Sequence, residues 1–179
     1  DDVAVCCVPN AGKILPIFSR RMLALADELI SFHLYGPMQA TLQLQGKQVS
    51  IRQVTAYPFE ERITAHIGAP GLAFTAEFRI PAWCKNPSIK VIGAKDVKQV
   101  QLSDRFQISA TWGPDSKVEL DFPQELTHRM IPDGRYVFDV GPLVFSVPIA
   151  HVATDYREYK VKGYADQDVV AVNAKWIYP

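Results

Sequence analysis

The sequence lacks several features that mark particular protein classes. It has no charge excess of either sign, since 19 lysine and arginine residues balance 19 aspartate and glutamate residues. A surface that binds nucleic acid or an anionic membrane normally carries a basic excess, so neither partner is expected. The apolar runs are short and interrupted by polar residues or proline, well below the roughly 18 residues of a membrane span. A membrane-embedded protein is therefore not expected either.

The sequence also lacks a disulfide framework. It has three cysteines, an odd number, and two of them are adjacent. Small secreted domains are stabilised instead by an even number of spaced cysteines. We expect the thiols to be free or bound to a metal, which favours a cytoplasmic location over a periplasmic or secreted one.

Helical spacing of apolar side chains is confined to the N-terminal part, where it predicts one α-helix over residues 11–30. From Leu34 onward, apolar side chains recur at every second residue. Short alternating runs are separated by turns rich in glycine, proline and asparagine, which is typical of a β-sandwich. The clearest strand covers residues 72–80. Others are predicted around residues 42–44, 49–51, 63–67, 106–110, 118–122, 135–140 and 143–149, with a last short strand at 169–176.

Residues 150–170 are rich in charged side chains and are predicted to form an exposed connection. The fold class is mainly β: an antiparallel, jelly-roll-like β-sandwich preceded by one helix. This helix has no helical partner within the chain. It therefore looks like the end of a domain that begins upstream.

Cys6 and Cys7 are the most unusual residues because they directly precede the predicted helix. A helix N-terminus favours thiolates, and a thiolate is both a zinc ligand and a nucleophile. On spacing alone, two interpretations stay open. The commoner one is a pair of small buried side chains, and the other is a metal-binding or catalytic pair.

Six short sequence blocks favour the metal-binding or catalytic interpretation of Cys6 and Cys7, because the blocks occur in the order found in one family. The chain resembles the bacterial beta-L-arabinofuranosidase family of glycoside hydrolases. The blocks are Cys-Cys-Val-Pro-Asn at 6–10, Leu-Tyr-Gly-Pro at 34–37, Thr-Ala-Tyr-Pro-Phe at 55–59, Phe-Arg-Ile-Pro-Ala-Trp-Cys at 78–84, Trp-Gly-Pro-Asp at 112–115 and Gly-Pro-Leu-Val-Phe at 141–145.

The resemblance implies an upstream helical-barrel catalytic domain followed by β-sandwich domains. Residues 1–33 would end the catalytic domain, 34–126 would form a β-sandwich, and 127–179 would complete it or start a second β domain. Cys6 would be the nucleophile and Cys7 a zinc ligand, with both sulfurs in the zinc site. The remaining ligands and the acid/base glutamate would lie upstream. The implied activity is retaining hydrolysis of an oligosaccharide or glycan.

The chain departs from the family pattern in two places, at 91–93 and 110–115, which indicates a distant subfamily. With part of the site absent, the isolated chain is expected to be inactive. A different interpretation is a β-sandwich that binds carbohydrate or supports a partner domain without chemistry of its own. An uncovered helix and an incomplete thiol pair would favour self-association into a homo-oligomer.

Other candidate residues have plainer interpretations. Cys84 and the four scattered histidines are expected to be structural or incidental, and Glu60 and Glu61 to lie on a solvated surface. Arg79 is expected to pair with Glu77 or to contact a neighbouring domain. Three aromatic residues could stack on sugars, although core or interface positions are more common for them: Tyr57, Trp83 and Trp112.

Overall fold

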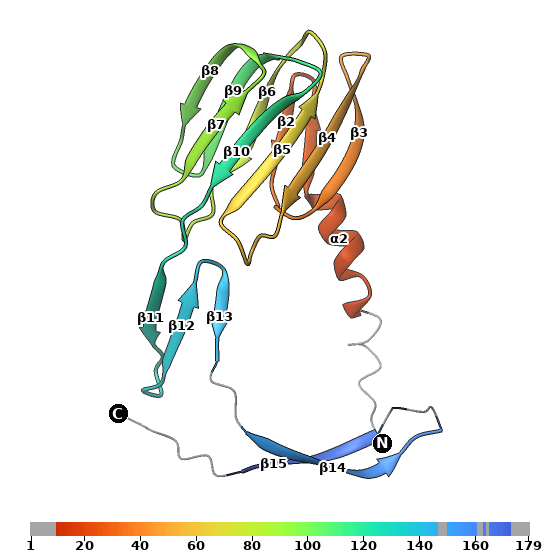
Figure 1. Cartoon of the computed structure of the whole chain (residues 1–179), viewed down its shortest axis with the longest axis vertical. Coiled ribbons are helices and arrows are strands. Elements are labelled where there is room, and N and C mark those ends of the chain that lie inside the picture. The colour runs from red at the N-terminus through yellow and green to blue at the C-terminus, as the bar shows by residue number, and fades with distance from the viewer. Residues whose placement is uncertain (1–9, 147–149, 161–162, 164, 173–179) are drawn as a thin grey trace. The chain divides into compact units, whose positions relative to one another are not determined.

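The computed structural model describes residues 10–146, 150–160, 163 and 165–172. The chain divides into two compact units (Figure 1). One comprises Asp1–Thr127 with Asp139–Leu143, and the other His128–Phe138 with Val144–Pro179. Within the described residues, no helix is long and apolar enough to cross a membrane.

The helix α2 spans Ile14–Arg21, with Lys13 as its N-cap. Pro16 lies in the first turn, where its missing N–H group removes no hydrogen bond. Arg20 and Arg21 lie in the last turn, where positive charge complements the helix dipole. The prediction of one helix before the strands is confirmed.

The predicted helix is too long, because residues 23–32 form a hairpin instead. Strands β1 (Leu23–Ala26) and β2 (Leu29–Phe32) pair antiparallel, with Ala26 opposite Leu29. β2 then pairs in parallel with β6 (Leu72–Arg79). The dense apolar residues of this segment fit both helical and alternating spacing, and the pairing with β6 decides in favour of strands.

Two five-stranded sheets form the sandwich, which confirms the predicted fold class (Figure 1). The pairs are antiparallel except β2 with β6. The first sheet has the order β1-β2-β6-β9-β8, where β9 is Arg105–Trp112 and β8 is Lys95–Gln101. The second has the order β3-β4-β5-β10-β7, made of Met38–Leu44, Lys47–Thr55, Arg62–Gly68, Ser116–Asp121 and Ser88–Ile92.

The core lies between these sheets and is built from the apolar side of each alternating strand. Phe32 stacks on Phe78 with ring centroids 4.4 Å apart. Trp112 is fully buried, and its indole N–H donates to the carbonyl oxygen of Phe74 at 3.0 Å. Burial of large apolar rings of this kind is the main stabilising term in folding.

The remaining strands form two small sheets. β11 (Leu126–Met130), β12 (Tyr136–Val140) and β13 (Leu143–Phe145) make one. β14 (His151–Glu158) and β15 (Ala165–Ala171) make the other. The described residues of 150–170 are largely exposed, as predicted, but they form these two strands instead of a connection. The predicted last strand at 169–176 overlaps the end of β15, and its residues 173–176 lie outside the described residues. β14 and β15 are paired strands, although their charged composition is typical of a loop.

Replacing Phe78 by alanine should destabilise the sandwich by about 3–5 kcal/mol, because the change removes a stacked ring and leaves a cavity. Denaturant unfolding of the two proteins measures this difference. Val100→Ala is the control, because Val100 is 50% exposed, and it should change the free energy of unfolding by less than about 0.5 kcal/mol. Equal effects of the two substitutions would contradict the assigned core.

Candidate functional site at the helix end of the sandwich

The predicted catalytic pair, Cys6 and Cys7, lies outside the described residues. Ile14, the first residue of α2, comes seven positions after Cys7. The part of the described structure closest along the chain is the end of the sandwich that carries α2.

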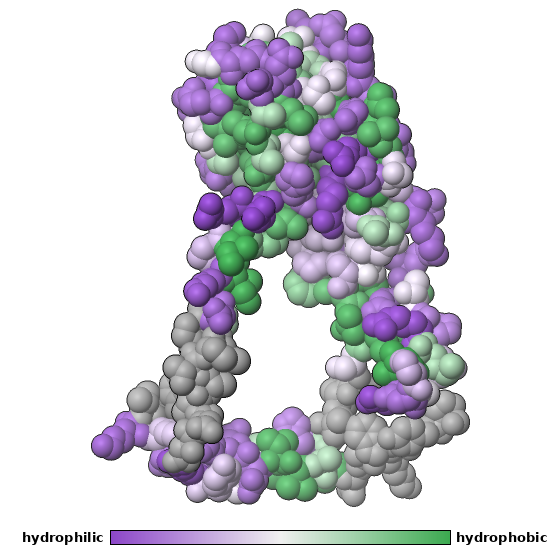
Figure 2. Space-filling model, turned by 180° about the vertical axis from the view of Figure 1, so that it is seen from behind, coloured by the Kyte–Doolittle hydropathy of each residue, from purple (hydrophilic) through white to green (hydrophobic). Residues whose placement is uncertain are grey.

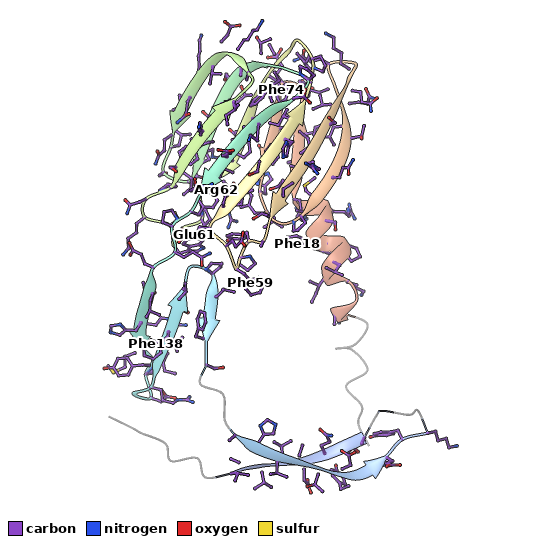
Figure 3. All side chains as sticks on the ribbon, viewed as in Figure 1. Phe18, Phe59, Glu61, Arg62, Phe74 and Phe138 are labelled. Carbon is purple, nitrogen blue, oxygen red and sulfur yellow. The ribbon has the colours of Figure 1, made fainter. Side chains whose placement is uncertain are left out.

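Strand registers show which segments meet at this end. Leu23 is opposite Phe32, Phe32 lies beside Phe78, and Arg79 is opposite Arg105. In the second sheet, Asp121 is opposite Arg62. The segments that form this "helix end" are α2 with Met22, and residues 33–37, 56–61, 80–87, 102–104 and 122–125 (Figure 3).

Four aromatic side chains close the core at the helix end. The Tyr35 ring lies 6.0 Å from that of Tyr57 and 5.4 Å from that of Phe122, and Trp83 meets Phe122 edge-on at 6.5 Å. The Tyr35 hydroxyl donates to the carbonyl oxygen of Arg79 at 2.6 Å. Burial raises the pKa of Tyr35 far above its ordinary value. Tyr57 and Trp83 are partly buried and pack against the core.

The C-terminal part of α2 is fixed to the sandwich, whereas its N-terminal part is not covered. The Phe18 ring and the Met22 side chain lie against Gly36, and the carbonyl oxygen of Met22 accepts the His33 N–H at 2.9 Å. Ile14 and Leu15 are 63% and 75% exposed. Hydrophobic side chains are correspondingly visible on the surface over α2 (Figure 2).

The loop 56–61 is held to the segment after β10 by hydrogen bonds. The Gln124 backbone N–H donates to the Glu61 carboxylate at 2.7 Å, and its side-chain amide donates to the carbonyl oxygen of Pro58 at 3.0 Å. Glu60 and Glu61 are both exposed, as predicted, and Glu61 in addition has a structural contact. Phe59 projects from this loop and is 79% exposed (Figure 3). Phe59 was not predicted as a functional residue from the sequence, although an aromatic residue within a turn was the available signal.

Glu77 is the one buried carboxylate among the described residues, and it forms a network on the outer face of the first sheet. It accepts hydrogen bonds from Ser31 at 2.8 Å and Gln107 at 2.7 Å, and forms an ion pair with Arg105 at 3.3 Å. The expected pairing with Arg79 was wrong, because Arg105 on the adjacent strand reaches the carboxylate instead. Burial raises the pKa of Glu77, but the hydrogen bonds and the Arg105 charge outweigh it and hold this pKa below its ordinary value.

The other candidate side chains have structural positions. Cys84 is a buried free thiol, and burial raises its pKa, so it is protonated and unreactive at neutral pH. Trp112 lies in the core and cannot contact a sugar. Among the described residues, no group of three or more His, Cys, Asp or Glu side chains is placed to hold a metal ion.

Comparisons with known proteins identify the family of the sandwich. Residues 29–124 match the family described as beta-L-arabinofuranosidase, GH127 middle domain. The chain belongs to the GH127 family. The matched range begins with β2 and ends just after β10, so the GH127 middle domain coincides with most of the sandwich. No curated protein matches the chain.

Three solved structures share the fold at low sequence identity. A GH127 beta-L-arabinofuranosidase from Geobacillus stearothermophilus T6 has 22% identity and a TM-score of 0.68, covering 78% of this chain and 23% of its own. A GH127 beta-arabinofuranosidase has 21% identity and a TM-score of 0.66, covering 84% and 30%. A glycoside hydrolase has 20% identity and a TM-score of 0.66, covering 98% and 34%. The chain thus spans about a quarter to a third of these proteins.

Acid should weaken the sandwich partly through Glu77. Because the folded-state pKa of Glu77 is below its unfolded value, its contribution is complete above the unfolded value and is lost as the pH falls through the folded one. Glu77→Gln should cost about 1–3 kcal/mol near neutral pH and flatten the decline between about pH 5 and pH 3. Unfolding free energies measured across this range test the prediction. Glu60→Gln is the control and should leave the profile unchanged.

Proposed function

We propose that the chain is the supporting β-sandwich part of a GH127 glycoside hydrolase that acts on arabinose-containing glycans. The observation that carries this proposal is the match of residues 29–124 to the GH127 middle domain, preceded closely by the Cys6-Cys7 pair. The shared fold of solved GH127 proteins supports it. This proposal includes the glycan substrate and a catalytic domain in the same polypeptide.

In the full-length protein, Cys6 would act as the nucleophile. Its thiolate would attack the anomeric carbon while the leaving oxygen takes a proton from an upstream acid. Water would then release the sugar from sulfur with the configuration retained. Thiolate sulfur is a ligand that zinc binds readily. Zinc held by Cys7 and Cys6, with ligands from upstream, would keep the nucleophile deprotonated.

The described residues favour a supporting role for the sandwich itself. Its buried carboxylate, Glu77, is fully engaged by Ser31, Gln107 and Arg105. Its buried thiol, Cys84, has a raised pKa. Neither group is available as a general acid or a nucleophile. A sandwich without chemistry, which binds carbohydrate or supports a partner, is the second candidate function, and for the isolated chain the two proposals converge.

In the full-length protein, Cys6→Ser should abolish arabinofuranosidase turnover, because serine is a far weaker nucleophile at neutral pH. Cys7→Ser should lower both zinc content and turnover. Cys84→Ala serves as the matched control because its thiol is buried in the sandwich, and it should retain zinc and activity. Kinetics on an arabinofuranoside together with metal analysis would decide. Full activity of Cys6→Ser would remove the glycosidase proposal.

The purified 179-residue chain should show no arabinofuranosidase turnover above background, because it would hold the nucleophile without its acid/base partner and the remaining zinc ligands. The measurement is release of a chromogenic leaving group from an arabinofuranoside, with the full-length protein as the positive control. Sustained turnover by the 179-residue chain would show that it contains a complete site.

A further inference from the structure

We propose that Phe59 is the anchor by which the helix end of the sandwich binds the catalytic domain of the same polypeptide. This inference rests on the proposed function, since it takes that domain as the partner. It assigns the contact to one side chain, and that side chain makes no contribution to the core of the sandwich.

The loop that carries Phe59 is already held in place. The Phe59 backbone N–H donates to the carbonyl oxygen of Ala56 at 2.9 Å. On the C-terminal side of Phe59, the Glu61 carboxylate accepts the Gln124 N–H at 2.7 Å, and the Phe122 N–H donates to the Glu61 carbonyl oxygen at 3.1 Å. Because the backbone is fixed in advance, burying the ring against a partner would order little further structure.

The exposure of Phe59 has no explanation within the sandwich. Four other rings, those of Tyr35, Tyr57, Trp83 and Phe122, close the core beneath it. Phe59 is not among these ring contacts and leaves 79% of its surface in solvent. Large rigid aromatic side chains in such positions commonly provide much of the binding energy of an interface.

The course of the chain brings neighbouring domains to the helix end. The chain enters the sandwich at the helix end through α2 and leaves it at the same end after β10. Figure 3 shows Phe18 of α2 and Phe59 at this end. The exposed Ile14, Leu15 and Ile17 of α2 also need a cover. The matched residues 29–124 are described as a middle domain, and the solved structures are about three to four times as long as the part that this chain matches. A catalytic domain that precedes the middle domain would lie on the α2 side of the chain.

Phe59 is less suited to bind a sugar than to bind a protein surface. Sugar sites combine an aromatic platform with several free polar groups that converge on the ring. Of the two carboxylates that follow Phe59, Glu61 accepts the Gln124 N–H with one oxygen, and Glu60 is exposed beside the ring. An apolar pocket on a protein partner needs only the ring, and the two apolar surfaces, Phe59 and α2, would be covered by one domain.

The test compares Phe59→Ala in the full-length protein and in the 179-residue chain. In the full-length protein the melting temperature should fall by roughly 3 °C or more, with faster proteolytic cleavage near α2. In the 179-residue chain it should stay within about 1 °C, because an exposed side chain contributes little. Phe59→Trp should restore the full-length value. Val97→Ala, at a 42% exposed position on β8, is the matched control and should change neither protein.

Each alternative outcome is decisive. An unchanged melting temperature of the full-length Phe59→Ala protein would overturn the proposal. An equal loss in the 179-residue chain would also overturn it, because Phe59 would then act within the sandwich. A raised KM for an arabinose oligosaccharide at unchanged stability would instead assign the ring to a glycan subsite. Zinc content and the Cys6→Ser result test the proposed function separately, so an interface without glycosidase activity would remain recognisable.

Discussion

The parallel pairing of β2 with β6 is the contact on which the arrangement of the chain depends. It places Ile30 and Phe32 in the core, where the Phe32 ring stacks on that of Phe78. It also brings β1 to the edge of the same sheet and fixes the direction in which α2 leaves the sandwich. Without it, residues 23–32 would have no sheet to join. The helix would then lose the attachment at Met22 and Gly36.

The same pairing explains which parts of the fold could be predicted from the sequence. In the strand at 72–80 every second residue is apolar and buried, so its spacing alone predicts β6, although Glu77 between two of these residues is buried as well. The segment Leu-Ala-Leu-Ala at 23–26 is apolar throughout, and only its partner strand decides its conformation. β14 shows the converse case, because its charged side chains hide a strand that is defined by its hydrogen bonds with β15. Local patterns therefore predict strands with one buried face better than strands without one.

The candidate site could likewise be predicted from the sequence only in part. Resemblance identified Cys6 and Cys7, whose roles remain predictions because the pair lies outside the described residues. The network around Glu77 could not be derived from the sequence, because Ser31, Gln107 and Arg105 come from two other strands and meet only through register. Phe59 is defined by exposure, which depends on what the rest of the chain leaves uncovered.

The tight turn between β3 and β4 has a practical consequence. Gln45 and Gly46 form a two-residue connection, both with positive φ, at the far end of the sandwich from α2. A Cβ added at Gly46 would meet no atom within 4 Å, so the surroundings are open. Since both covalent links of the sandwich leave from the other end, a fluorescent label or a short epitope grafted at this tip would report on the module without touching its connections.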